Sequence, residues 1–249
     1  MDPREDIIKK RLKNIKRVIA VSGGKGGIGK SLMSSVLALN LSEMGFKVGL
    51  LDLDFTSPST HIILGVDKAY PEEKNGIIPP KIHGIKYMSL VFYTNDDPSP
   101  LRGMDISNAL IELLAITIWD QMDFLVIDMP PGIGDMMLDI TRLTKKCEFL
   151  LVTTPSKVTM GTVEKLMGVL KGNKVPILGL VENMRMNNSP DFELNKYGVP
   201  LLGEIMFDEN VENSIGEPEK LLKTDFSRSL KKILNQIAQS SQDYTSSKL

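Results

Sequence analysis

Short, continuously apolar runs alternate with longer amphipathic stretches along most of the chain. Apolar runs of this kind predict strands that are buried on both faces of a sheet. The predicted strands cover residues 17–22, 47–54, 87–91, 124–128, 148–153 and 177–181. Apolar positions at helical spacing predict helices over residues 31–43, 107–117, 136–144 and 159–170. The alternation predicts an α/β fold, a doubly wound and mainly parallel sheet with helices on both faces.

The two ends of the chain carry amphipathic patterns that fit two interpretations. Residues 1–17 predict a basic N-terminal helix, and apolar residues recur at helical spacing between Phe226 and Ile237. Such a helix either packs on the sheet or binds a membrane surface, and we favour packing for the C-terminal one. We therefore expect a single domain over residues 1–239, followed by a polar, disordered tail over residues 240–249.

The composition of the chain argues against several classes of protein. Lys and Arg number 30 against 31 Asp and Glu, so a net charge of -1 gives no global basic field for nucleic acid. Neither a membrane-spanning apolar run nor a secretory signal is visible in the sequence, so we expect a cytoplasmic protein that does not bind membranes. The single cysteine, Cys147, excludes a disulfide framework and any iron–sulfur site with all its cysteines in one chain.

A glycine-rich segment follows the first predicted strand and precedes the first predicted long helix. Residues 24–31 read Gly-Lys-Gly-Gly-Ile-Gly-Lys-Ser, the eight-residue pattern of a phosphate-binding loop. Glycines let consecutive backbone N–H groups turn toward phosphate oxygens, and the following helix directs its positive end at them. Lys30 would neutralise the β- and γ-phosphates, and the Ser31 hydroxyl would bind Mg²⁺. The predicted nucleotide-binding residues of this loop are Gly24, Lys25, Gly26, Gly27, Ile28, Gly29, Lys30 and Ser31.

Lys25 is an additional lysine that an ordinary phosphate loop does not need. One interpretation is a solvated loop side chain. The other is a charge that reaches the nucleotide of a second subunit and stabilises the transition state, as an arginine finger does. The spacing alone leaves both open.

Residues 22–31 resemble the deviant phosphate loop of the MinD/ParA/nitrogenase-iron-protein class, and the chain as a whole resembles its Mrp/ApbC-type ATPases, the iron–sulfur cluster carriers. Further segments similar to this family occur in order at residues 50–59, 101–103, 127–135, 153–155, 181–184 and 200–205. The resemblance implies the P-loop NTPase fold, slow Mg²⁺-dependent ATP hydrolysis and a homodimer. It also favours the cross-subunit role of Lys25.

The resemblance assigns roles to polar residues at the ends of predicted strands. Asp54, at the end of the second predicted strand, would orient the attacking water, so the predicted catalytic residues are Lys25, Lys30 and Asp54. Asp128 would hold Mg²⁺ through water, with Ser31 as a direct ligand and Asp52 as outer support. Asn183 would recognise the adenine edge, because its amide can both donate and accept.

The chain departs from the family where the cluster cysteines belong. Mrp/ApbC-type carriers follow the Glu-Asn-Met segment with a Cys-x-x-Cys pair that bridges a cluster across the dimer. Residues 184–193 contain no cysteine here, and Cys147 has no cysteine near it in sequence. We therefore expect ATP or ADP and Mg²⁺ as cofactors, and no iron–sulfur cluster held within the chain.

Two functions from different classes remain at this point. The first is an ATP-hydrolysing dimeric switch in iron–sulfur cluster assembly or transfer, working with a thiol-bearing or cluster-accepting protein. The second is a MinD/ParA-like positioning or partitioning ATPase that binds a membrane or a nucleoid partner.

Overall fold

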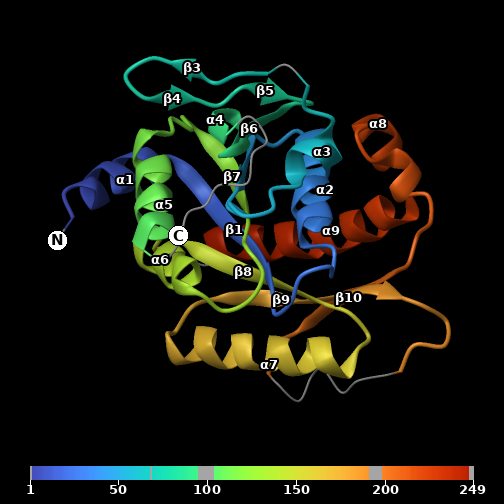
Figure 1. Cartoon of the computed structure of the whole chain (residues 1–249). Coiled ribbons are helices and arrows are strands. Elements are labelled where there is room, and N and C mark those ends of the chain that lie inside the picture. The colour runs from blue at the N-terminus through green and yellow to red at the C-terminus, as the bar shows by residue number, and fades with distance from the viewer. Residues whose placement is uncertain (1, 68, 95–103, 191–197, 247–249) are drawn as a thin grey trace.

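The computed structural model describes residues 2–67, 69–94, 104–190 and 198–246, and it is built around one eight-stranded sheet. The strand order is β10-β9-β8-β1-β7-β2-β6-β5, and every neighbouring pair is parallel except β5 and β6 (Figure 1). The strands of this sheet are β1 (Ile15–Gly23), β2 (Val48–Asp52), β5 (Lys81–Ile82), β6 (Ile85–Ser89), β7 (Met122–Asp128), β8 (Cys147–Thr153), β9 (Ile177–Arg185) and β10 (Leu201–Met206). A small antiparallel pair, β3 (Glu72–Glu73) and β4 (Ile77–Ile78), lies apart from it.

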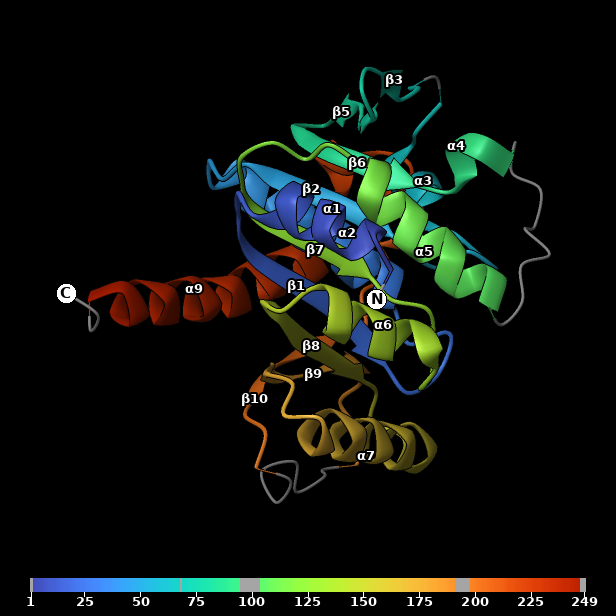
Figure 2. The same cartoon turned by 90° about the vertical axis from the view of Figure 1, so that its left-hand side faces the viewer.

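Helices cover both faces of the sheet, and a separate apolar core fills the space under each set. One core contains side chains of α1 (Arg4–Leu12), α5 (Met104–Ile116), α6 (Asp135–Leu143) and α7 (Lys157–Gly172). The other contains side chains of α2 (Lys30–Glu43), α3 (Thr60–Leu64), α8 (Pro218–Leu221) and α9 (Asp225–Ser246). Figure 2 shows the twisted sheet between these layers, from β6 near the top to β10 near the bottom. The predicted fold class is confirmed.

The remaining helical segments are short. α4 (Val91–Thr94) follows β6, and a 3₁₀ turn, η2 (Glu212–Ser214), lies between β10 and α8. Within the described residues, no helix is long and apolar enough to cross a membrane.

The amphipathic ends of the chain pack on the domain. In α1, Ile8 is fully buried, and this helix lies against α5 and α6. In α9, the apolar residues that recur at helical spacing are all buried, and the helix lies against α2 and β10. These residues are Phe226, Leu230, Ile233, Leu234 and Ile237. The apolar face of α9 is therefore used inside the fold, and α1 contributes Ile8 to the core while Ile7 stays exposed.

Three predicted boundaries were wrong. The N-terminal helix ends at Leu12 and not at residue 17, because Ile15 and Arg17 already pair with β7. β2 ends at Asp52, two residues early, because Leu53 N donates to the Asp128 carbonyl and the chain then turns. The helical backbone of α9 continues to Ser246 through most of the expected tail, since no proline or glycine interrupts it there. The family-like segment at residues 101–103 lies outside the described residues.

Candidate functional site

The glycine-rich loop joins the central strand β1 to α2, with its open side toward solvent. Gly27 and Gly29 have positive φ values of 76° and 84°, which residues with a side chain rarely adopt. A Cβ atom built on Gly26 or Gly27 would meet nothing within 4 Å. One built on Gly24 would lie 2.3 Å from the Thr162 hydroxyl. The loop is therefore closed on the side of α7 and open on the other, as a cradle for phosphates requires.

The two lysines of this loop have opposite environments. Lys30, the first residue of α2, is 6% exposed, and its charge acts on buried Asp128. Lys25 is exposed and makes no hydrogen bond or ion pair with any described residue. The Lys30 ammonium thus belongs to the pocket of its own chain, whereas Lys25 is free to reach a neighbouring molecule.

Two buried carboxylates face each other at the mouth of the loop. Parallel pairing of β2 with β7 places Asp52 directly beside Asp128, with exposed fractions of 1% and 0%. Burial raises the pKa of both, and the charge of Asp52 raises that of Asp128 further. The hydroxyls of Ser31 and Ser34 and the Lys30 ammonium act in the opposite direction and lower the Asp128 pKa. Two like charges so close together would be stabilised by a bound cation.

The Asp128 carboxylate fits a magnesium site of the P-loop type. No described residue donates a well-aligned hydrogen bond to either of its oxygens, although the side chain is fully buried. No group of three or more His, Cys, Asp or Glu side chains is arranged to hold a metal in the described parts of the chain. Mg²⁺ commonly takes one or two protein ligands and keeps several waters, so such a group is not required. Ser31 and, through water, Asp128 are the residues that would hold it.

Asp54 lies just beyond the end of β2 and shapes the turn that follows. Its Oδ1 accepts hydrogen bonds from Thr56 Oγ1 at 2.9 Å and from Ser57 N at 3.1 Å, and the residue is 8% exposed. Its own backbone N donates to Asp52 Oδ1 at 2.9 Å. The structure therefore fixes Asp54 in a tight turn beside Asp52 instead of within the strand.

Asn183, on β9, is in contact with the glycine-rich loop. The residue is 1% exposed, and its Nδ2 donates to the Ile28 carbonyl at 2.9 Å. A Cβ atom on Gly29 would lie 2.4 Å from the same nitrogen. The amide predicted to recognise adenine thus supports the loop in this structure, and base recognition stays a prediction.

Replacing Gly29 by Ala should destabilise the protein and weaken nucleotide binding. The left-handed conformation costs a residue with a side chain about 1–2 kcal/mol, and the new methyl would overlap the Asn183 amide. Gly161, inside α7, is the matched control, because a Cβ there meets nothing within 4 Å. Gly161→Ala should stabilise by about 0.5–1 kcal/mol. Denaturant unfolding of both variants measures the change in the free energy of unfolding. A change of the same sign in both variants would contradict the prediction.

Cys147 lies at the opposite end of the strands from this site. It is the first residue of β8, whose carboxyl end is at Thr153, and it is 2% exposed. Burial raises the pKa of its thiol to about 12. A hollow of about 280 Å³ near it is lined by Arg142, Lys145 and Lys174 among others. The thiol is therefore in its protonated form at neutral pH, and a metal would have to displace that proton.

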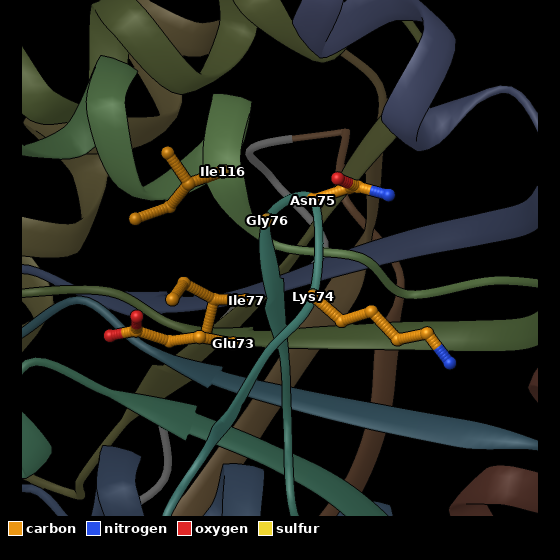
Figure 3. A pocket seen from close by; sticks show the side chains of 6 residues that line it. All are labelled: Glu73, Lys74, Asn75, Gly76, Ile77 and Ile116. Carbon is orange, nitrogen blue, oxygen red and sulfur yellow. The ribbon is translucent and has the colours of Figure 1, made fainter.

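Another hollow lies between the β3–β4 hairpin and the end of α5. It has a volume of about 360 Å³ and is lined by Glu73, Lys74, Asn75, Gly76, Ile77 and Ile116 (Figure 3). Arg11 of α1 donates to the Asn75 carbonyl at 3.0 Å and to the Ala115 carbonyl at 3.1 Å. None of the predicted nucleotide-site residues lines this hollow.

Sequence analysis did not identify Thr60, which contacts Asp52, or Tyr87, which contacts Thr60. Thr60 Oγ1 donates to Asp52 Oδ2 at 2.5 Å and lies 2.9 Å from the Tyr87 hydroxyl. Thr60 opens the five-residue helix α3, and Tyr87 lies on β6. The only available signal was a tyrosine within an apolar strand, which by itself indicates core packing.

Comparisons with known proteins agree with this arrangement. A family model described as "ParA: NUBPL iron-transfer P-loop NTPase" matches residues 14–241. The iron–sulfur cluster carrier protein of Aquifex aeolicus is 33% identical over 257 residues, covering 93% of this chain and 71% of that protein. The chain spans 48% to 71% of the length of eight curated relatives compared with it.

Two solved structures share the fold. A nucleotide-binding protein from Archaeoglobus fulgidus in complex with ADP is 30% identical, with a TM-score of 0.71 over 88% of this chain and 92% of that one. The cell division ATPase MinD of Pyrococcus furiosus is 24% identical, with a TM-score of 0.67 over 90% of this chain and 99% of that one. With a phosphate-binding loop, paired carboxylates and a family match over most of its length, the chain belongs to the ParA/NUBPL family of iron-transfer P-loop NTPases.

Proposed function

We propose that this protein is an Mg²⁺-dependent ATPase that works as a dimeric switch in iron–sulfur cluster assembly or transfer. The observation that carries the proposal is the buried Asp52–Asp128 pair at the mouth of an intact phosphate loop. Two carboxylates so placed are stabilised by a bound cation, and a nucleotide on the loop would supply phosphate oxygens to the same ion. Bound Mg²⁺ would neutralise charge that develops on the phosphates during hydrolysis.

Three further residues of this chain have separate roles in the proposed hydrolysis. Lys30 would hold the β- and γ-phosphates from within the pocket, and Asp54 would orient the attacking water from the turn after β2. Lys25, exposed at the surface, would complete the site of a second copy. Homodimer formation is part of the proposal, because Lys25 makes no hydrogen bond or ion pair within the described part of its own chain.

The part played in cluster chemistry differs from that of a carrier with its own cysteines. The curated relatives are named iron–sulfur cluster carrier proteins, but Cys147 is the only cysteine in this chain. It is buried at the amino end of β8, away from the loop. Two copies in a dimer would supply two thiols, whereas a cluster usually draws on four protein ligands. We propose that the cluster is held by a thiol-bearing partner whose binding or release is coupled to ATP.

Anaerobic reconstitution with iron and sulfide tests this proposal. We expect the protein to hydrolyse ATP only when Mg²⁺ is present, and to retain no stoichiometric iron or sulfide after desalting. Cys147→Ser is the control and should change neither result. Stoichiometric iron and sulfide in the wild-type protein, lost in Cys147→Ser, would show that the chain carries its own cluster.

The positioning function receives no support from the helices that could have bound a membrane. Its main sequence argument was the amphipathic pattern near both ends of the chain. Ile8 of α1 and the five apolar residues of α9 are buried against the sheet and neighbouring helices, whereas Ile7 of α1 is exposed. MinD shares the fold of this chain at 24% identity, and that likeness extends to the fold alone.

A further inference from the structure

A line of buried polar groups leads from β6 to the carboxylates of the nucleotide site. Tyr87 and Thr60 are both fully buried, and Asp52 is 1% exposed. The Tyr87 hydroxyl lies 2.9 Å from Thr60 Oγ1, which lies 2.5 Å from Asp52 Oδ2. The other oxygen of Asp52 accepts the backbone N–H of Asp54 at 2.9 Å. Three elements, β6, α3 and β2, thus meet at one carboxylate.

The numbers of available donors and acceptors decide which group donates in each hydrogen bond of this line. An ionised carboxylate only accepts, so the one proton of the Thr60 hydroxyl is donated to Asp52. The Thr60 oxygen then has only lone pairs to offer, and Tyr87 must donate to it. Burial, followed by the charge of Asp52, raises the pKa of Tyr87 well above its usual value, so this hydroxyl keeps its proton. Each group therefore orients the next one.

The register of the sheet explains why these residues meet. Asp52 pairs with Ser89 and Leu50 pairs with Tyr87 on the adjacent parallel strand, so Tyr87 is on the same face of the sheet as Asp52. Thr60 follows the turn of residues 54–57 and begins the helix that lies over this face. Among the described residues, the Thr60 hydroxyl connects the tyrosine to the carboxylate.

We propose that Thr60 and Tyr87 are positioning residues for ATP hydrolysis, which hold the Asp52 carboxylate so that its second oxygen fixes the backbone of Asp54. The inference rests on the proposed ATPase function. Neither residue belongs to the phosphate loop, so neither is expected to contact the nucleotide. Loss of the Thr60 hydroxyl removes one hydrogen bond that orients the Asp52 carboxylate, and loss of the Tyr87 hydroxyl leaves Thr60 less constrained. In either case Asp52 would hold the backbone of Asp54 less firmly.

Two substitutions remove one hydroxyl each with little change of shape: Thr60→Val and Tyr87→Phe. Thr60 donates its hydrogen bond to a charged group, so we expect kcat to fall by about tenfold or more in Thr60→Val. The fall in Tyr87→Phe should be smaller. The KM for ATP should stay within about twofold, because the loop is unchanged. Thr60→Ser retains the hydroxyl and should restore most of the wild-type kcat.

Matched controls separate positioning from general destabilisation. Thr117→Val removes another buried threonine hydroxyl, which lies just after α5, donates to the Leu113 carbonyl at 2.5 Å and is outside the site. Tyr93→Phe alters an exposed tyrosine on α4. Neither should change kcat. An equal fall in kcat for Thr60→Val and Thr117→Val, or the absence of rescue by Thr60→Ser, would overturn the proposal.

A binding measurement keeps this test independent of turnover. The affinity of a fluorescent ATP analogue, titrated at increasing Mg²⁺ concentrations, reports how well the Asp52–Asp128 pair supports the metal. Thr60→Val should require several-fold more Mg²⁺ than wild type or Thr117→Val for half of the affinity gain. An unchanged Mg²⁺ requirement would overturn the positioning role. A wild-type protein that binds the analogue with Mg²⁺ but never hydrolyses ATP would instead contradict the proposed function alone.

Discussion

Replacing Lys25 by Ala should abolish ATP hydrolysis while leaving nucleotide affinity nearly unchanged. The side chain is exposed and makes no hydrogen bond or ion pair with a described residue of its own chain, so its removal should disturb neither the fold nor the cradle. A cation supplied from another subunit to the transition state contributes about 10³- to 10⁵-fold in rate. We therefore expect the steady-state rate of phosphate release to fall by about this factor, while a fluorescent ATP analogue still binds.

Two further lysines serve as controls for this experiment. Lys30→Ala should lose nucleotide binding itself, because Lys30 is buried in the pocket at the start of α2. Lys81→Ala, at an exposed lysine on β5, should behave as wild type. Mixing Lys25→Ala with a hydrolysis-deficient variant that retains Lys25 should restore part of the activity in mixed dimers. Wild-type turnover by Lys25→Ala would rule out the cross-subunit role.

Replacing Asp54 by Asn should slow hydrolysis strongly and cause the ATP-bound dimer to accumulate. The amide oxygen of asparagine can still accept from Thr56 Oγ1 and Ser57 N, so the turn should survive. Only the charge that orients the attacking water is removed, for which a loss of about 10²- to 10⁴-fold in rate is expected. Gel filtration with ATP and Mg²⁺ should show a dimer that persists for longer than that of wild type.

The control for this variant is Asp67→Asn, at an exposed carboxylate after α3. It should change neither the rate nor the elution volume. A monomeric Asp54→Asn protein in saturating ATP would contradict ATP-driven dimer formation. A rapid turnover by the same variant would contradict the assigned role of Asp54.

Sequence reasoning reached the fold and the loop because both depend on local patterns. Apolar strand runs and the Gly-Lys-Ser ending are readable within a few residues, and parallel strands place Asp128 at the same edge as the loop. The contacts of Asp52 with Thr60 and of Ile28 with Asn183 join residues that are 8 and 155 positions apart. Such contacts depend on strand register and helix placement, which a single sequence does not specify.

Boundaries were predicted less well than elements, for a related reason. Lys16 and Arg17 gave the first residues a basic, helix-like pattern. Arg17 instead lies in β1, where its guanidinium pairs with Glu148 on β8. Lys16 pairs with Asp123 on β7. Partners from distant strands accommodate charged side chains at the start of a central strand, and this overrides the local preference.

The central position of β1 has a consequence for the order in which the protein becomes functional during synthesis. β1 pairs with β7 and β8, whose first residues are Met122 and Cys147, and the loop after β1 is completed by Thr162 and Asn183. A nascent chain that has emerged only as far as α2 contains the whole phosphate-binding motif but none of these neighbours. Pairing over such sequence distances is slow compared with helix formation. Nucleotide can therefore stabilise the folding chain only after β9 has left the ribosome, when more than two thirds of the polypeptide has been made.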